Sequence, residues 1–220
     1  MFLGHVGVGL GAKALVPRVS LGTLLFASFF IDLLWATLLV LGLERVEISP
    51  GATAVTPLLF TEYPFSHSLV AVIFWAALFG LVFFLVRRCL KDALVCGAVV
   101  LSHWTLDLVA HRQDLQLIPG LPARVGFGLW NNITATLAVE ISIFAFGIIL
   151  YCYHTKASDR TGSMGFRSML ILLPVLYLFQ IFGPPPPEAT VLELAGQALW
   201  LLVIWGYWIE RHRTLRWLYN

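Results

Sequence analysis

Apolar runs of about twenty residues make up most of this chain, and they constrain its fold more than any other feature. A helix needs ~20 apolar residues to cross the hydrocarbon core of a bilayer, where every backbone polar group must be satisfied within the protein. Of the 220 residues, 59% are hydrophobic and only 12% are charged, which is about half the charged fraction of a soluble domain. The runs therefore predict an all-α, polytopic transmembrane helical bundle. Six spanning helices are expected, at residues 21–43, 66–87, 92–111, 128–153, 167–183 and 189–210.

The segment before the first run, "MFLGHVGVGLGAKALVP", is apolar but too short to cross the bilayer. Its glycines leave a smooth helix face that another helix can approach closely, and Gly7 with Gly11 matches the small-xxx-small spacing. We therefore predict a glycine-rich, half-inserted N-terminal helix that packs against the bundle. Its first positive charges follow the apolar run, which is unlike a cleaved signal peptide, so this segment is expected in the mature protein.

The chain is expected to form one integral membrane domain over residues 1–220. Residues 1–20 would form the N-terminal half-helix, residues 21–115 carry the polar motifs, and residues 116–220 provide the remaining spans and a cytoplasmic tail. The fifth apolar run is short and contains Pro174, so a kink or a tilt is expected there.

The basic residues predict the orientation, because cytoplasmic loops carry an excess of Lys and Arg. With the N-terminal segment inside, eleven of the 14 Lys and Arg residues face inward and three face outward. The expected location is a prokaryotic cytoplasmic (inner) membrane with both termini cytoplasmic. The inner residues are Lys13, Arg18, Arg87, Arg88, Lys91, Lys156, Arg160, Arg167, Arg211, Arg213 and Arg216, and the outer ones are Arg45, Arg112 and Arg124.

Ionisable side chains inside the predicted spans are the strongest functional signal. An ionised Asp at the centre of a spanning helix costs ~2.5–3.5 kcal/mol on insertion scales, so a functional role is the default hypothesis for such a residue. Asp32 lies near the middle of the first run. In "LSHWTLDLVAHRQDL", His103, Asp107 and His111 are spaced four residues apart, so all three project from one helix face.

Two further histidines have depths that match this stripe. His67, in "PFSHSLV", opens the second run at its outer face, and His5 lies among the N-terminal glycines. Neutral imidazoles and carboxylates suit zinc and other divalent first-row metals. We therefore predict a divalent metal site, with zinc expected and manganese as the alternative. The expected ligands are His5, Asp32, His67, His103 and Asp107, and the expected catalytic residues are His67, Asp107 and His111.

Structural roles are the alternative for each of these residues. His103 with Asp107 can form an ion pair or an interhelical hydrogen bond, and His111 can cap the end of its helix. Glu140 can hydrogen-bond between helices as a neutral acid. Ser66 is a candidate N-cap, and a solvated loop is the expected surrounding of Asp114.

These motifs together resemble a bacterial and archaeal family described as membrane-bound, metal-dependent hydrolases, some of them LexA-regulated. Its members tend to show an early Gly-His, an Asp in the first long span, a T/S-H-S at the head of a later span, and an H-x3-D. The resemblance covers about residues 1–115 and implies a metal-dependent hydrolase. The matching residues here are Gly4-His5, Asp32, Ser66-His67-Ser68 and His103-x3-Asp107.

The chain departs from this family pattern at two places. The family often carries D-x-D-H where this chain has Asp32-Leu33-Leu34-Trp35, and a basic H-R-G where it has Tyr63-Pro64-Phe65. Loss of those ligands favours a single metal, or none, over a two-metal centre.

The leading hypothesis is therefore an integral membrane, metal-dependent hydrolase with membrane lipid around it and a lipid or lipid-linked phosphoester as substrate. An ion or proton transporter is the first alternative, and a structural or partner-binding membrane protein is the second. The net charge of +2 is too small to suggest nucleic-acid binding. The oligomeric state and the bond cleaved are left open.

Overall fold

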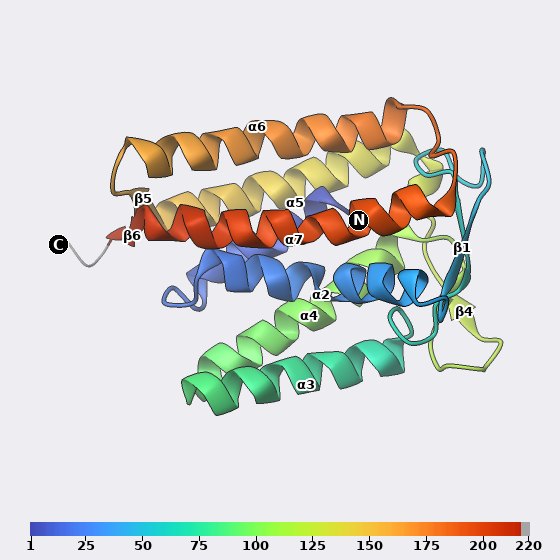
Figure 1. The fold of residues 1–220 in the computed structure, drawn as a ribbon, viewed down its shortest axis with the longest axis horizontal. Helices are drawn as coiled ribbons and strands as arrows, with labels where there is room; N and C mark the ends of the chain where they lie inside the picture. The colour runs from blue at the N-terminus through green and yellow to red at the C-terminus, as the bar shows by residue number, and fades with distance from the viewer. Residues whose placement is uncertain (217–220) are drawn as a thin grey trace.

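The computed structural model describes residues 1–216, and most of them lie in seven α-helices (Figure 1). Six of these helices are long and apolar enough to cross a membrane, and α1 is the exception. The predicted all-α bundle is confirmed, and the chain is an integral membrane protein by the length and composition of its helices. The helices are α1 (Leu3–Gly11), α2 (Leu21–Val40), α3 (Leu69–Arg87), α4 (Leu90–Ala110), α5 (Ile133–His154), α6 (Arg160–Phe182) and α7 (Ala189–Arg211).

Short antiparallel strand pairs, which the hydropathy pattern did not indicate, close both ends of the bundle. Two pairs lie at the end of the bundle where α2 and α4 finish, and the third lies at the opposite end (Figure 1). The third pair joins the residues after α5 to those after α7. The pairs are β1 (Arg45–Ile48) with β2 (Leu58–Glu62), β3 (Leu115–Gln116) with β4 (Arg124–Val125), and β5 (Thr155–Ala157) with β6 (Arg213–Leu215).

Polar caps decide where the helices begin. The prediction that Ser66 caps the second span is wrong, because Ser68 is the N-cap and its hydroxyl accepts the Ala71 N–H at 3.3 Å. The fifth span is also longer than predicted. Asp159 caps α6 by accepting the Gly162 N–H at 2.7 Å, and the helix continues through Pro174 to a length of 23 residues. The first turns of α6 are polar and have a low hydropathy, so hydropathy alone placed the start of this helix too late.

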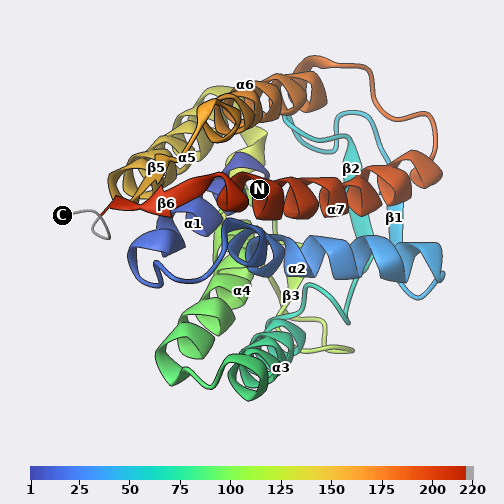
Figure 2. The same ribbon diagram turned by 60° about the vertical axis from the view of Figure 1, so that its left-hand side comes forward.

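Helix α1 lies inside the bundle, against α2, α4 and α5 (Figure 2). The contact with α5 is close because Gly7 packs on the backbone of Ile143 and Phe144, and Gly147 packs on the backbone of Gly7. This confirms that the glycine-rich segment packs against the bundle. Its tight packing brings His5, which is 1% exposed, into the interior.

Helix α2 separates two apolar cores. On one side Leu25 and Phe29 pack with residues of α5, α6 and α7, and on the other side Leu24 and Ile31 pack with residues of α3 and α4. Asp32 lies at the centre of this helix, between the two cores. A carboxylate flanked by two apolar cores needs polar or charged partners.

Candidate metal centre

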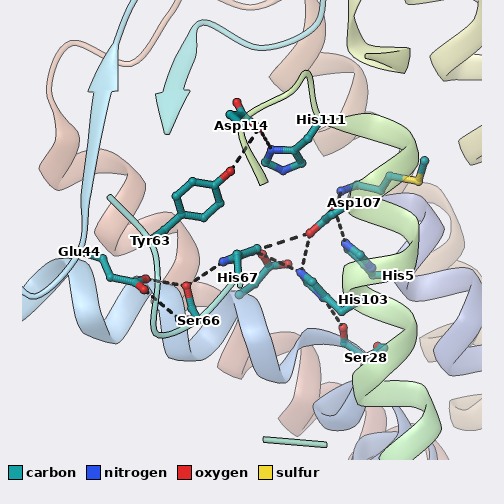
Figure 3. Close-up of polar contacts among 12 residues, drawn as sticks. His5, Ser28, Glu44, Tyr63, Ser66, His67, His103, Asp107, His111 and Asp114 are labelled. Carbon is teal, nitrogen blue, oxygen red and sulfur yellow. Dashed lines mark hydrogen bonds and ion pairs between the residues drawn. The ribbon is translucent and has the colours of Figure 1, made fainter. Parts of the chain in front are cut away.

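Five ionisable side chains from four parts of the chain form two overlapping groups, His5 with His103 and Asp107, and Asp32 with His67 and His103. Figure 3 shows the three histidines and Asp107 side by side. Asp32 comes from α2, His103 and Asp107 come one turn apart from α4, and His5 comes from α1. His67 lies just before the N-cap of α3. These are the five residues that the sequence predicts as metal ligands.

The donor atoms lie at contact distances from one another. His103 Nε2 is 3.1 Å from Asp107 Oδ2 and 3.5 Å from Asp32 Oδ1. His67 Nε2 is 3.8 Å from Asp107 Oδ2 and 3.9 Å from Asp32 Oδ1. His5 Nε2 is 3.3 Å from Asp107 Oδ1, and its ring stacks on that of His103 with 3.8 Å between centroids. Asp107 Oδ1 also accepts the Met1 amino group at 2.7 Å.

Most of the cluster is buried. His5, His67, His103 and Asp107 are at most 4% exposed, whereas the side chain of Asp32 is 26% exposed. A cavity of about 140 Å³ adjoins the cluster and is lined by Asp32, His67 and Asp107 among other residues. It has room for several waters. Trp35, Phe60, Trp130 and Tyr177 contribute aromatic walls to this cavity.

An outer hydrogen bond orients the ring of His103. Its Nδ1 lies 3.0 Å from the backbone carbonyl of Ser28, which can only accept, so Nδ1 carries a hydrogen. In a neutral imidazole the lone pair is then on Nε2, the atom that faces the two carboxylates. Such outer partners are the usual means by which proteins fix the tautomer of a metal-ligating histidine.

A chain of three side chains orients His67 in the same way. The Ser66 hydroxyl donates its one hydrogen to Glu44 Oε2 at 2.5 Å, so it must accept from His67 Nδ1 at 2.8 Å. Glu44 Oε1 also accepts the backbone N–H groups of Phe65 and Ser66, both at 2.8 Å. Burial lowers the pKa of His67 to about 3. A neutral His67 therefore directs the lone pair of Nε2 toward Asp32 and Asp107.

Lone pairs and negative carboxylate oxygens thus meet in one buried place. The Met1 amino group supplies a positive charge at Asp107 Oδ1, but the imidazole lone pairs that face the two carboxylates remain unfavourable unless a further cation lies among them. The Nε2 atoms of His5 and His103 are buried and have no hydrogen-bond partner in the described chain. Three imidazole nitrogens and two carboxylates are a donor set that suits a divalent metal. The residues present therefore fit the metal that the sequence predicts. A proton on His103 is the alternative cation, and it would make the cluster a structural ion pair.

The remaining candidates lie around this cluster. His111 follows the last residue of α4 and lines the cavity, outside the group of donor atoms. Glu140 accepts the N–H groups of Phe2 (2.9 Å) and Gly4 (3.2 Å), and so connects α5 to the start of α1. The expected solvated loop at Asp114 is wrong, because Asp114 is only 6% exposed and contacts His111.

Sequence reasoning missed the residues that support the cluster from outside. Glu44 follows α2 in a loop, and nothing in its spacing connects it with Ser66, which lies 22 positions later. Tyr63 and Asp114 are separated by 51 positions and meet only in the folded chain. The Ser-His-Ser motif was a usable signal, because it placed a hydroxyl directly beside a predicted ligand.

Replacing Ser66 by Ala is expected to weaken zinc binding about 10–100-fold, the usual effect of losing an outer partner of a ligand. The reason is that His67 Nδ1 loses its acceptor and the ring loses its orientation. Ser68→Ala is the matched control. It removes the N-cap of α3, which costs about 1 kcal/mol of stability, and should leave the zinc affinity unchanged. Competition titrations against a zinc chelator measure both variants, and equal affinities would contradict this role of Ser66.

The fold and the site together define a class of protein: a polytopic membrane protein with a buried histidine–carboxylate cluster beside a cavity. Compared with protein-family models, curated protein sequences and solved structures, the chain matches none.

Proposed function

We propose that this protein is a membrane-embedded, metal-dependent hydrolase that acts on a lipid or lipid-linked phosphoester. The observation that carries the proposal is the convergence of the Nε2 atoms of His5, His67 and His103 on Asp32 and Asp107. Zinc is the proposed metal and manganese the alternative, and the family resemblance of the motifs supports the same chemistry. When bound, such an ion acts as a Lewis acid that polarises a phosphoryl oxygen and activates water near neutral pH.

The surroundings of the cluster support a small polar group with an apolar attachment as substrate. The cavity is lined both by polar side chains, such as Asp32 and His67, and by aromatic rings, such as Trp35 and Phe60. It adjoins α6, on which Tyr177 and Gln180 reach the cavity, whereas neighbouring residues such as Phe179 are exposed on the bundle surface. A lipid headgroup that enters sideways, with its chains along an apolar helix face, fits this combination.

A transport path is less well supported than catalysis. A conducting protein needs polar side chains that continue from the site to both ends of the bundle. On the side of the cluster toward the start of α2, packing is apolar, with Leu24, Ala27, Val99 and Val100 buried together. We therefore assign the cluster to catalysis. We further propose that the β5–β6 end is cytoplasmic in a prokaryotic inner membrane, because most basic residues belong to that end.

Metal content is the test of this function. Protein would be purified in mild detergent without chelators or a histidine tag and analysed by mass spectrometry, as wild type and as His103→Ala. About one equivalent of zinc or manganese is expected in the wild type and less than about a tenth in the variant. Both proteins would then be assayed with short-chain phosphatidic acid and bis(p-nitrophenyl) phosphate, where only the metal-loaded wild type should show turnover.

Circular dichroism and size-exclusion chromatography would establish that the variant is folded. A folded wild type that takes up no divalent metal, even after dialysis against zinc and manganese, would overturn the proposal. Metal without turnover on any phosphoester would overturn the reaction and leave a structural metal site.

A further inference from the structure

A second group of polar side chains meets the cavity where α4 ends. His111 Nδ1 is 3.0 Å from Asp114 Oδ1, and the same oxygen accepts the Tyr63 hydroxyl at 3.2 Å. Arg112 Nε donates to the other carboxylate oxygen at 3.3 Å. His111, Asp114 and Tyr63 are each at most 6% exposed. This group joins the segment before α3, through Tyr63, to the segment after α4, and its supporting residues lie outside the metal-ligand candidates.

The contacts of Asp114 fix which nitrogen of His111 carries hydrogen. An ionised carboxylate can only accept, so the hydrogen of a neutral imidazole lies on Nδ1 and the lone pair lies on Nε2. The Tyr63 hydroxyl donates to the same carboxylate oxygen, because that oxygen can only accept. The Tyr63 hydroxyl and the Arg112 guanidinium hold the Asp114 carboxylate in place. The carboxylate in turn orients the His111 imidazole.

Aromatic contacts fix the plane of the ring. The His111 ring lies with its centroid 4.4 Å from that of Trp130 and 4.8 Å from that of Phe60. It lines the same cavity as Asp32, His67 and Asp107, with 6.5 Å between the ring centroids of His111 and His67. Figure 3 shows the ring between Asp114 on one side and the cluster on the other. With Nδ1 on Asp114, the opposite nitrogen is the one left for a group in the cavity.

We propose that Asp114 is a positioning residue, which together with Tyr63 holds His111 so that its Nε2 accepts a hydrogen bond from water beside the metal cluster. The inference rests on the proposed hydrolase function and adds a residue pair to it. The water so oriented would attack the phosphorus and give its proton to His111 Nε2, while the P–O bond to the alcohol breaks and the alcohol leaves with that proton. A carboxylate–histidine pair of this kind serves the same orienting purpose in hydrolases of unrelated fold, where replacing the Asp by Asn yields the wrong tautomer.

The test combines a tautomer measurement with kinetics. Protein labelled with ¹⁵N in its histidine rings would be compared by NMR as wild type, Asp114→Asn and Tyr63→Phe, and His111→Gln would identify the His111 signals. The wild type is expected to carry hydrogen on Nδ1 and none on Nε2. Asp114→Asn should reverse this assignment, because an amide nitrogen in the place of Oδ1 donates to Nδ1 while the amide oxygen, in the place of Oδ2, still accepts from Arg112 Nε.

The kinetic result expected for Asp114→Asn is a fall in kcat of about 10²–10⁴-fold, with KM on bis(p-nitrophenyl) phosphate within about twofold of wild type. Zinc content should stay at the wild-type level, because no ligand is changed. Tyr63→Phe should act in the same direction but more weakly, since it removes one hydrogen bond to the carboxylate.

Three outcomes would overturn the inference. One is a wild type with hydrogen on Nε2 of His111, and another is an Asp114→Asn variant whose kcat stays within about twofold of wild type. In both, zinc content and wild-type turnover still support the proposed function. The third is a zinc-loaded wild type that hydrolyses no phosphoester, which overturns the proposed function and this inference together.

Discussion

Zinc added to the metal-free protein is expected to raise its unfolding temperature, and Asp107→Asn is expected to abolish that rise. Asp107 faces His5 through one oxygen and His67 and His103 through the other, so its loss removes the group that all three imidazoles share. A ligand that binds only the folded state, at 100 times its Kd, stabilises that state by about 2.7 kcal/mol. Differential scanning fluorimetry in detergent, with and without zinc, measures the shift.

The same experiment separates a metal site from a structural ion pair. Asp107→Asn strands the buried Met1 amino group in either case, which costs about 3–5 kcal/mol whether or not zinc is present. If a protonated His103 were the cation of the cluster, adding zinc would not enlarge this cost. A metal site instead predicts that the difference in unfolding temperature between wild type and variant is larger with zinc than without it. Asp92→Asn, at the other end of α4, is the matched control and should respond to zinc as the wild type does. Equal destabilisation with and without zinc would contradict the metal site.

Gly7→Ala is expected to destabilise the protein and to weaken zinc binding, although Gly7 contacts no ligand. A Cβ at this position would lie 2.6 Å from the carbonyl oxygen of Ile143 and 2.9 Å from the Cα of Phe144. These are backbone atoms of α5, so α1 itself must shift. Overpacking of this kind costs about 1–3 kcal/mol, against a gain of ~1 kcal/mol in helix propensity. The shift would carry His5 away from Asp107 and reduce the zinc affinity.

Gly11→Ala supplies the control on the same face of the same helix. Its Cβ would lie 3.4 Å from a side-chain carbon of Leu150 and 3.7 Å from the Cα of Gly147, which are ordinary contacts. This variant should keep the wild-type zinc affinity and gain up to about 1 kcal/mol in stability. Thermal unfolding and zinc titration of both variants check the pair. A Gly7→Ala protein as stable as Gly11→Ala would show that α1 does not depend on this contact.

Hydropathy predicted most of the fold because the membrane imposes a single length scale on its helices. The six predicted spans correspond to α2 through α7, and most of their ends differ by a few residues. The largest error is at α6, whose polar first turn is set by the Asp159 cap and not by apolar composition. The strand pairs could not be predicted, because β5 and β6 are short and lie 58 positions apart in the chain at Thr155 and Arg213.

The members of the candidate site could be predicted because an ionisable side chain in a spanning helix is costly and therefore usually has a functional or pairing role. Asp32, His103 and Asp107 stood out on this ground, and the structure places them together with His5 and His67. The partners outside the cluster could not be found in this way. Glu44 and Asp114 lie in loops, where a carboxylate is unremarkable, and only tertiary contacts make them buried.

The position of α1 also sets the order in which this protein can mature during synthesis. His5 is made about a hundred positions before its partner Asp107, and the α5 backbone that seats Gly7 follows later still. A helix too short to span the bilayer must therefore wait at the membrane until four more helices have been inserted. All five proposed ligands are present once α4 is made, but α1 is seated only by α5. A ribosome-bound chain that stops before α5 should therefore bind zinc more weakly than the full chain.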